Sequence, residues 1–178
     1  MLSFHVRHAL MKLSTNRGEL GTSLIEATIA AATSAMFLGS LFAMNVTSMK
    51  TIRSAREAGC ASQVLQQRIE SLRIANWHQI TDANWLRTNV LNTTPAGGAT
   101  LTALSETLTL VPYGSATTGN TQIVRTGTNT SIVNQNNNML AESAMKVIWT
   151  VAYSGGVKGD AVTRQTVAIL SKGGVAKW

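Results

Sequence analysis

The stretch Thr22–Met49, TSLIEATIAAATSAMFLGSLFAMNVTSM, decides how the rest of this 178-residue chain is interpreted. It holds a single charged residue, Glu26, and the 23 residues from Ala27 to Met49 include no Asp, Glu, Lys, Arg or His. A helix rises about 1.5 Å per residue, so these residues reach about 34 Å, whereas the hydrocarbon core of a bilayer is about 30 Å thick. The stretch therefore predicts a helix that can span a membrane.

Small and hydroxyl-bearing residues are frequent in this stretch, among them Thr28, Thr33 and Ser40. In a membrane, such residues let helix backbones approach closely and form hydrogen bonds between helices. The stretch is therefore better suited to packing against other helices than to lying alone in lipid.

Basic residues flank the stretch on both sides. Arg7, Lys12 and Arg17 precede it, and by the positive-inside rule they keep the N-terminus in the cytoplasm and send the residues after Met49 across the membrane. The far side is also basic, with Lys50, Arg53 and Arg56, which weakens this argument from charge.

Glu26 stands just before the uncharged run. A carboxylate inside the span costs about 2.5 to 3.5 kcal/mol on insertion scales, so it should have a partner. The alternative is that Glu26 lies in the first turn of the helix and complements the helix dipole, with Thr22 or Ser23 as N-cap. Spacing alone does not choose between these two interpretations.

The heptapeptide GTSLIEA, residues 21–27, follows a short basic leader and precedes an apolar helix. In this it resembles the processing site of type IV prepilins and of the pseudopilins of type II secretion systems. The resemblance implies that a membrane peptidase cuts after Gly21 on the cytoplasmic side and methylates the new amine of Thr22. Glu26 is then the fifth residue of the mature chain, where this family has glutamate. A cut after Gly18 would put Ser23 at that position, so Gly21 is the better candidate.

The resemblance also implies a role for Glu26, which would pair with the N-terminal ammonium of Thr22 in a neighbouring subunit of a fibre. The family usually begins its mature chain with Phe or Met, so Thr22 is a departure that leaves methylation open. The form SLIEA is closer to minor pilins and minor pseudopilins than to abundant fibre subunits. The motif covers only residues 17 to about 50.

Helical periodicity continues after the uncharged run, and we expect one helix from Ser23 to Ala75. Its apolar stripe should pack on a sheet, and Arg68, Glu70 and Arg73 are expected to lie off that stripe. The stripe consists of Ala58, Ala61, Leu65, Ile69 and Leu72.

The rest of the chain predicts strands. Residues 78–100 form a connection between the helix and the first strand, with turn signals at Pro95, Gly97 and Gly98. The expected strands are 107–113, 121–126, 144–153 and 161–171, the last two forming a hairpin, with a polar loop at 127–138. The strand 144–153 should cover the helix stripe with one face, made by Val147, Trp149, Val151 and Tyr153. The expected fold is α+β and pilin-like, a long N-terminal helix packed on a small antiparallel sheet.

Little in the sequence suggests catalysis. The one cysteine, Cys60, excludes an intrachain disulfide, and after residue 76 the chain has one histidine, His78, and four acids far apart in sequence. A metal site or hydrolytic triad needs convergent side chains. The net charge of +7 is carried by scattered residues, which disfavours nucleic acid as a partner. We therefore predict no enzyme activity, no metal and no cofactor.

The sequence thus predicts a minor pilin or pseudopilin, with leader 1–21, membrane and assembly half 22–49, amphipathic half 50–76 and β-rich domain 77–178. The resemblance implies the bacterial inner membrane as its location, with the last of these parts periplasmic. It implies prepilin peptidase, other pilin or pseudopilin subunits and the inner-membrane assembly platform as partners. Pilus, secretion pseudopilus and DNA-uptake fibre stay open. Two alternatives are an exported protein whose signal peptide ends near Ala43, and a permanent single-pass anchor carrying a β-rich binding domain.

Overall fold

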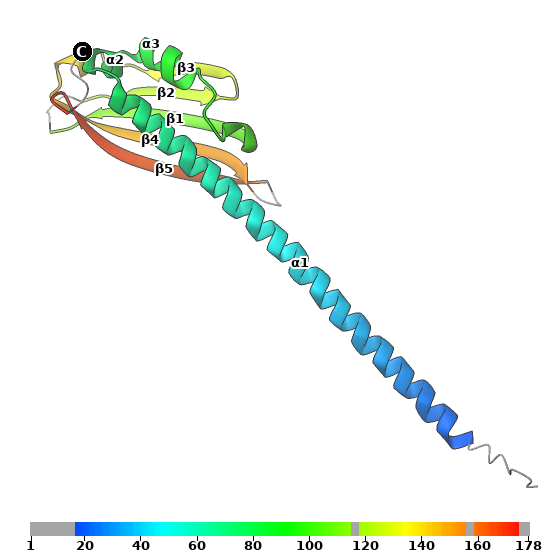
Figure 1. The fold of residues 1–178 in the computed structure, drawn as a ribbon. Helices are drawn as coiled ribbons and strands as arrows, with labels where there is room; N and C mark the ends of the chain where they lie inside the picture. Colours follow the sequence, from blue (N-terminus) through cyan, green and yellow to red (C-terminus); the bar gives the residue numbers. More distant parts are fainter. Residues whose placement is uncertain (1–16, 115–117, 156–158, 175–178) are drawn as a thin grey trace, which may run out of the picture. The chain divides into compact units, whose positions relative to one another are not determined.

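The computed structural model describes residues 17–114, 118–155 and 159–174, with side chains from Ser23 onward. The chain divides into two compact units, Met1–Thr47 and Ser48–Trp178. One helix, α1 (Arg17–Ile74), supplies the described part of the first unit and enters the second (Figure 1). The predicted leader, 1–21, lies mostly outside the described residues.

α1 begins six residues before the predicted start at Ser23 and ends one residue before the predicted end at Ala75. Its end has a local cause, because Asn76 leaves the helical conformation and caps the next helix, α2 (Trp77–Thr81). The Asn76 side chain accepts a hydrogen bond from the backbone N–H of Gln79, and the Gln79 side chain accepts one from the Asn76 N–H. The chain therefore turns as α1 stops.

The predicted connection contains more regular structure than its turn signals indicate. After α2 follow α3 (Ala83–Trp85), the π-helix η1 (Leu86–Leu91) and the 3₁₀ turn η2 (Gly98–Thr100). Asp82 caps the start of α3 because its Oδ1 accepts hydrogen bonds from the backbone N–H groups of Asn84 and Trp85. Apolar residues anchor these short elements in the core: Trp77, Ile80, Ala83, Leu86, Val90 and Leu91.

The second unit contains a five-stranded antiparallel sheet with the order β3-β2-β1-β4-β5. The strands are β1 (Thr102–Pro112), β2 (Thr121–Thr126), β3 (Asn129–Asn134), β4 (Ala144–Gly155) and β5 (Asp160–Ser171). Another 3₁₀ turn, η3 (Met139–Ala141), precedes β4. The predicted α+β class, with a long N-terminal helix and an antiparallel sheet, is confirmed.

Two details of the strand prediction are wrong. β1 begins five residues before the predicted Thr107, because pairing with both β2 and β4 extends it. β3 lies inside the predicted loop 127–138. It is an edge strand whose one partly buried apolar residue, Ile132, pairs with the buried Ile123 of β2, so its own sequence shows almost no alternation. Gly127, with a φ of 61°, forms the two-residue turn before it.

The core of the second unit lies between α1 and one face of the sheet. Burial alternates along β4, and the predicted face with Val147, Trp149, Val151 and Tyr153 is confirmed. In Figure 1 the C-terminal part of α1 runs across this face of the sheet. It contributes buried apolar residues at helical spacing: Ala61, Val64, Leu65, Ile69 and Leu72.

Candidate functional site

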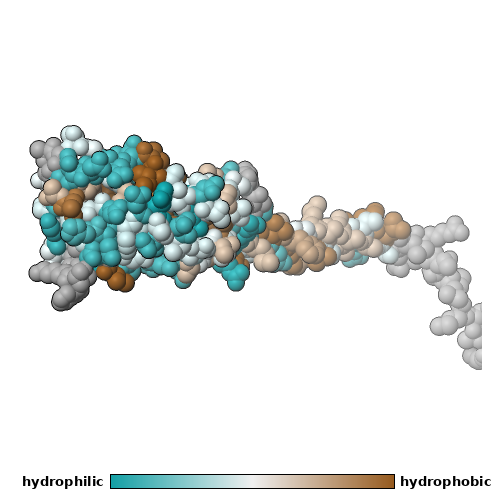
Figure 2. All heavy atoms as spheres, turned by 90° about the horizontal axis from the view of Figure 1, so that it is seen from above, coloured by the Kyte–Doolittle hydropathy of each residue, from teal (hydrophilic) through white to brown (hydrophobic). Residues whose placement is uncertain are grey.

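The uncharged part of α1 is open to its surroundings along its whole described length. Every side chain from Ser23 to Arg56 is exposed, and large apolar side chains such as Met36 and Phe42 are 76% and 70% exposed. Brown and tan residues dominate the helix segment in Figure 2, whereas teal is frequent over the second unit. So much apolar surface needs a cover of lipid or of other protein.

This part of α1 has no polar side. Large apolar residues point in all directions around the helix axis, as in Ile29, Phe37, Leu38 and Phe42. A helix that is apolar all round belongs in a membrane or in the interior of a bundle. Within the described residues, α1 is the one helix long and apolar enough to cross a membrane. By length and composition it could be a membrane anchor, and a signal sequence near an N-terminus meets the same criterion.

Four hydroxyl groups in this segment donate to backbone carbonyls of the helix itself. Thr28 donates to the carbonyl of Ile25 at 2.8 Å, and Ser40 donates to that of Phe37 at 2.7 Å. Thr33 and Thr47 also donate to backbone carbonyls one turn earlier. Hydroxyls bonded in this way need no water, so they are compatible with an apolar environment.

One line along the segment consists only of small residues at every fourth position: Ala27, Ala31, Ala35, Gly39 and Ala43. Residues four apart lie on the same side of a helix, and small side chains at that spacing allow two helices to approach closely. A Cβ atom added at Gly39 would meet no other atom within 4 Å. The fold of the single chain therefore does not explain a glycine at this position.

The sequence motif lies near the start of α1. Gly21 and Thr22 belong to the helix, but the Thr22 side chain lies outside the described part of the chain. Glu26 is exposed and is the tenth residue of α1, so the alternative in which Thr22 or Ser23 caps the helix and Glu26 lies in its first turn is wrong for the uncut chain. A cut after Gly21 would make Glu26 the fifth residue from the new N-terminus.

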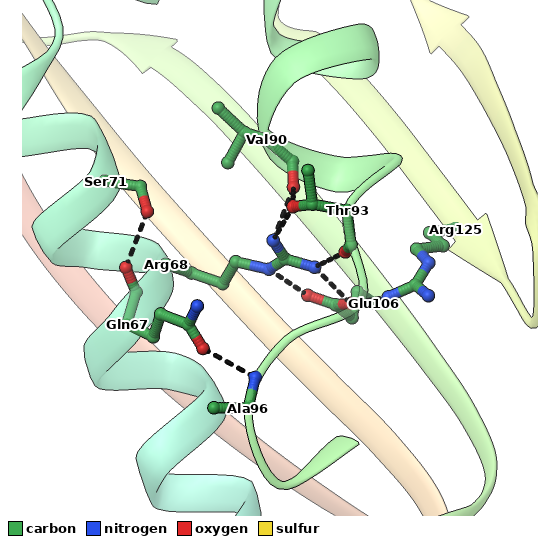
Figure 3. Close-up of polar contacts among 8 residues, drawn as sticks. All are labelled: Gln67, Arg68, Ser71, Val90, Thr93, Ala96, Glu106 and Arg125. Atoms are coloured by element: carbon green, nitrogen blue, oxygen red, sulfur yellow. Dashed lines mark hydrogen bonds and ion pairs between the residues drawn. The ribbon is translucent and has the colours of Figure 1, made fainter. Parts of the chain in front are cut away.

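A second polar site lies inside the second unit (Figure 3). Arg68 was expected off the apolar stripe, but it is buried with only 1% exposure. Its guanidinium donates to both oxygens of Glu106, at 2.8 and 2.9 Å, and to Val90 O, Thr93 Oγ1 and Thr93 O. These contacts use all five N–H donors of the group. The prediction for Arg68 fails because its charge is matched inside the core.

Glu106 also accepts a hydrogen bond from Arg125 of β2 at 2.6 Å. This Arg68–Glu106–Arg125 cluster places two positive charges against one negative charge in a buried site. The Arg68 guanidinium also lies 5.8 Å from the centroid of the Trp149 ring. Both Glu106 oxygens are occupied by guanidinium groups, so this carboxylate is not available as a general base.

The cluster joins segments that are distant in sequence. Arg68 is on α1, Glu106 on β1 and Arg125 on β2. The contacts to Val90 and Thr93 hold the end of η1 and the residues that follow it. Gln67 adds a contact by accepting from the backbone N–H of Ala96 at 2.7 Å. The arrangement fastens α1 and the connecting segment to the sheet, which is a structural role.

His78 lies on α2, and its side chain is exposed. It borders a polar hollow of about 340 Å³ whose other lining residues are Thr81, Asp82, Gln135, Asn136, Asn137 and Leu140. Among the described residues, no three His, Cys, Asp or Glu side chains are close enough to hold a metal ion.

No protein-family model, curated protein or solved structure matches this chain. The resemblance to prepilins therefore rests only on the sequence of residues 17 to about 50.

Proposed function

We propose that this chain is the precursor of a minor pilin or pseudopilin. A prepilin peptidase would cut it after Gly21, the uncharged part of α1 would hold it in the bacterial inner membrane, and the C-terminal domain would be periplasmic. Together with other subunits and an inner-membrane assembly platform, the mature chain would then enter a type IV pilus-like or type II secretion fibre.

One observation carries the proposal. Glu26 stands five residues after Gly21 at the start of a helical segment that is uncharged for 23 residues and exposed on all sides. A signal peptide does not need an acid before its apolar core. A carboxylate at this position is explained if a cation pairs with it in the assembled state, because pairing lowers the free-energy cost of a charge in an apolar environment.

Two ammonium groups compete for this role after processing. The first is that of a neighbouring subunit, as the resemblance implies. The second is the amine of Thr22 in the same chain, because residues four apart lie on the same side of a helix. Only pairing with a neighbouring subunit would make Glu26 necessary for assembly. Such pairing would also stabilise one axial stagger between neighbouring helices over the others. The effect of removing the charge therefore separates them.

The first experiment is mass spectrometry of the mature N-terminus. The proposal expects Thr22, with or without a methyl group, whereas a signal peptide predicts a start near Met44 and a permanent anchor predicts Met1. Gly21→Ala should leave the precursor uncut, and Gly18→Ala is the matched control that should still be cut. Cutting of the Gly21→Ala chain at Thr22 would contradict the assignment of the site.

The second experiment replaces Glu26 by Gln, which keeps the size of the side chain and removes its charge. We expect a chain that is cut and bound to the membrane but is poorly incorporated into fibres isolated by shearing. Normal incorporation would exclude pairing between subunits and would favour pairing within one chain. Glu70→Gln, an exposed acid of the same helix in the second unit, is the control and should assemble normally.

A second candidate function is a single-pass anchored periplasmic protein with a binding domain. The polar hollow beside His78 and Asp82 favours it, because amide, carboxylate and imidazole groups converge there. It predicts that the N-terminus is retained at Met1.

A further inference from the structure

The seven residues of α1 from Lys50 to Arg56, KTIRSAR, are here called the basic segment. They contain three cations and no acid, and all seven side chains are exposed. They follow the uncharged run directly, and the next residue, Glu57, is the first buried side chain of the second unit with 6% exposure. The basic segment is thus covered neither by the core of the domain nor, in the proposed membrane arrangement, by hydrocarbon.

The cations of the basic segment, Lys50, Arg53 and Arg56, are spaced by three residues, so they lie along one side of the helix. Arg53 donates from Nε to Glu57 Oε1 at 2.9 Å, which compensates its charge. Lys50 and Arg56 form no ion pair with any described residue. Two free positive charges therefore point away from α1 next to the end of the apolar run.

The basic segment is long enough to cross a headgroup layer. Seven helical residues rise about 10 Å. A bilayer of roughly 40 to 45 Å with a core of about 30 Å leaves roughly 5 to 8 Å of headgroups on each side. If Met49 lies at the edge of the hydrocarbon, the basic segment crosses the headgroup layer, where long Lys and Arg side chains can extend to phosphates.

We propose that Lys50 and Arg56 bind the headgroups of anionic phospholipids on the side of the membrane that carries the C-terminal domain. This inference relies on the proposed membrane role of α1. It adds a lipid partner to that role, and binding of this lipid would fix how deep the helix lies in the membrane. Charge complementarity selects the partner, because each Lys or Arg near an anionic membrane surface strengthens binding to that surface several-fold.

The test measures which headgroup lies beside the basic segment. The full-length chain with Cys60→Ala and a fluorophore on Ser54→Cys is placed in phosphatidylcholine nanodiscs. These contain a trace of either phosphatidylglycerol or phosphatidylcholine with a headgroup nitroxide that quenches the fluorophore. We expect stronger quenching by the anionic lipid at low salt, and loss of this preference near 1 M salt, where the Debye length is about 3 Å.

The double variant Lys50→Gln and Arg56→Gln should lower the ratio of anionic to neutral quenching by at least about fivefold, the effect of one charge at an anionic surface. The control, Arg87→Gln with Lys172→Gln, removes two charges from the C-terminal domain and should leave the ratio unchanged. Equal quenching by both lipids, or a ratio that the double variant does not change, overturns the inference.

The outcome is separable from that of the proposed function. Normal cutting after Gly21 and normal fibre incorporation, without any lipid preference, would overturn only the lipid inference. If the double variant then assembled poorly, the basic segment would bind an acidic protein surface instead of lipid. A chain that fails to enter nanodiscs would overturn both proposals.

Discussion

Replacing Glu106 by Gln should destabilise the C-terminal domain strongly. Glu106 is fully buried and accepts three hydrogen bonds from two guanidinium groups. Gln keeps the size of the side chain, but it removes the negative charge and turns one acceptor into an N–H donor that faces Arg68. Breaking one buried ion pair costs about 3 to 5 kcal/mol, and this substitution leaves two buried cations unpaired. We expect the free energy of unfolding to fall by about 4 to 5 kcal/mol, near the upper end of that range. A typical domain has a stability of about 5 to 15 kcal/mol.

The assay is urea unfolding of the full chain in detergent, followed by tryptophan fluorescence, to which Trp149 beside Arg68 contributes. Glu70→Gln is the matched control, because the Glu70–Arg73 pair has a separation of 2.8 Å, with both side chains 60% exposed. Exposed pairs contribute about 0 to 1 kcal/mol, so this variant should unfold nearly as the parent does. Equal losses of unfolding free energy in the two variants would refute the reasoning, since burial would then have no influence.

Two further predictions concern the two parts of α1. Gly39→Leu should leave urea unfolding unchanged, since an added Cβ meets nothing within 4 Å. It should abolish fibre incorporation if helices pack along the line of small residues. Met36→Leu is the control. Normal assembly of Gly39→Leu would show that this line faces lipid. Leu72→Ala removes a fully buried side chain and should lower the free energy of unfolding by about 2 to 5 kcal/mol in the same assay. A loss below about 1 kcal/mol would show that this part of α1 is not packed on the sheet.

Much of the fold could be predicted because burial imposes a period on the sequence. The alternation around Trp149 located β4, its hairpin with β5 and the face that covers α1. The period of three to four residues from Ala61 to Leu72 located the packed side of the helix. Pairing partners set the remaining strand limits. β3 stayed hidden because an edge strand buries almost nothing, although the glycine in the two-residue turn before it was a usable signal.

The buried charges were missed for a different reason. Arg68 stands three residues after Leu65 and four before Leu72, Glu106 shares the alternation of Leu108, and Arg125 that of Ile123. Each charge thus occupies a core position, whereas Arg68 was expected off the stripe and no position in the core was predicted for Glu106 or Arg125. Charges of opposite sign in phase with neighbouring apolar residues are a signal for an internal cluster, but sequence spacing does not show which of them meet.

The start of α1 is the feature with the widest consequence for processing. If the precursor is cut between Gly21 and Thr22, the scissile bond lies within the second turn of a helix that begins at Arg17. Proteolysis requires an extended backbone, so this end of the helix must fray before each cut. Fraying at a terminus costs little free energy, and glycine weakens a helix by about 1 kcal/mol relative to alanine. With Gly18 and Gly21 at this end of the helix, thermal fraying would be enough to expose the bond to the peptidase. Processing would then need no separate factor that unfolds the helix.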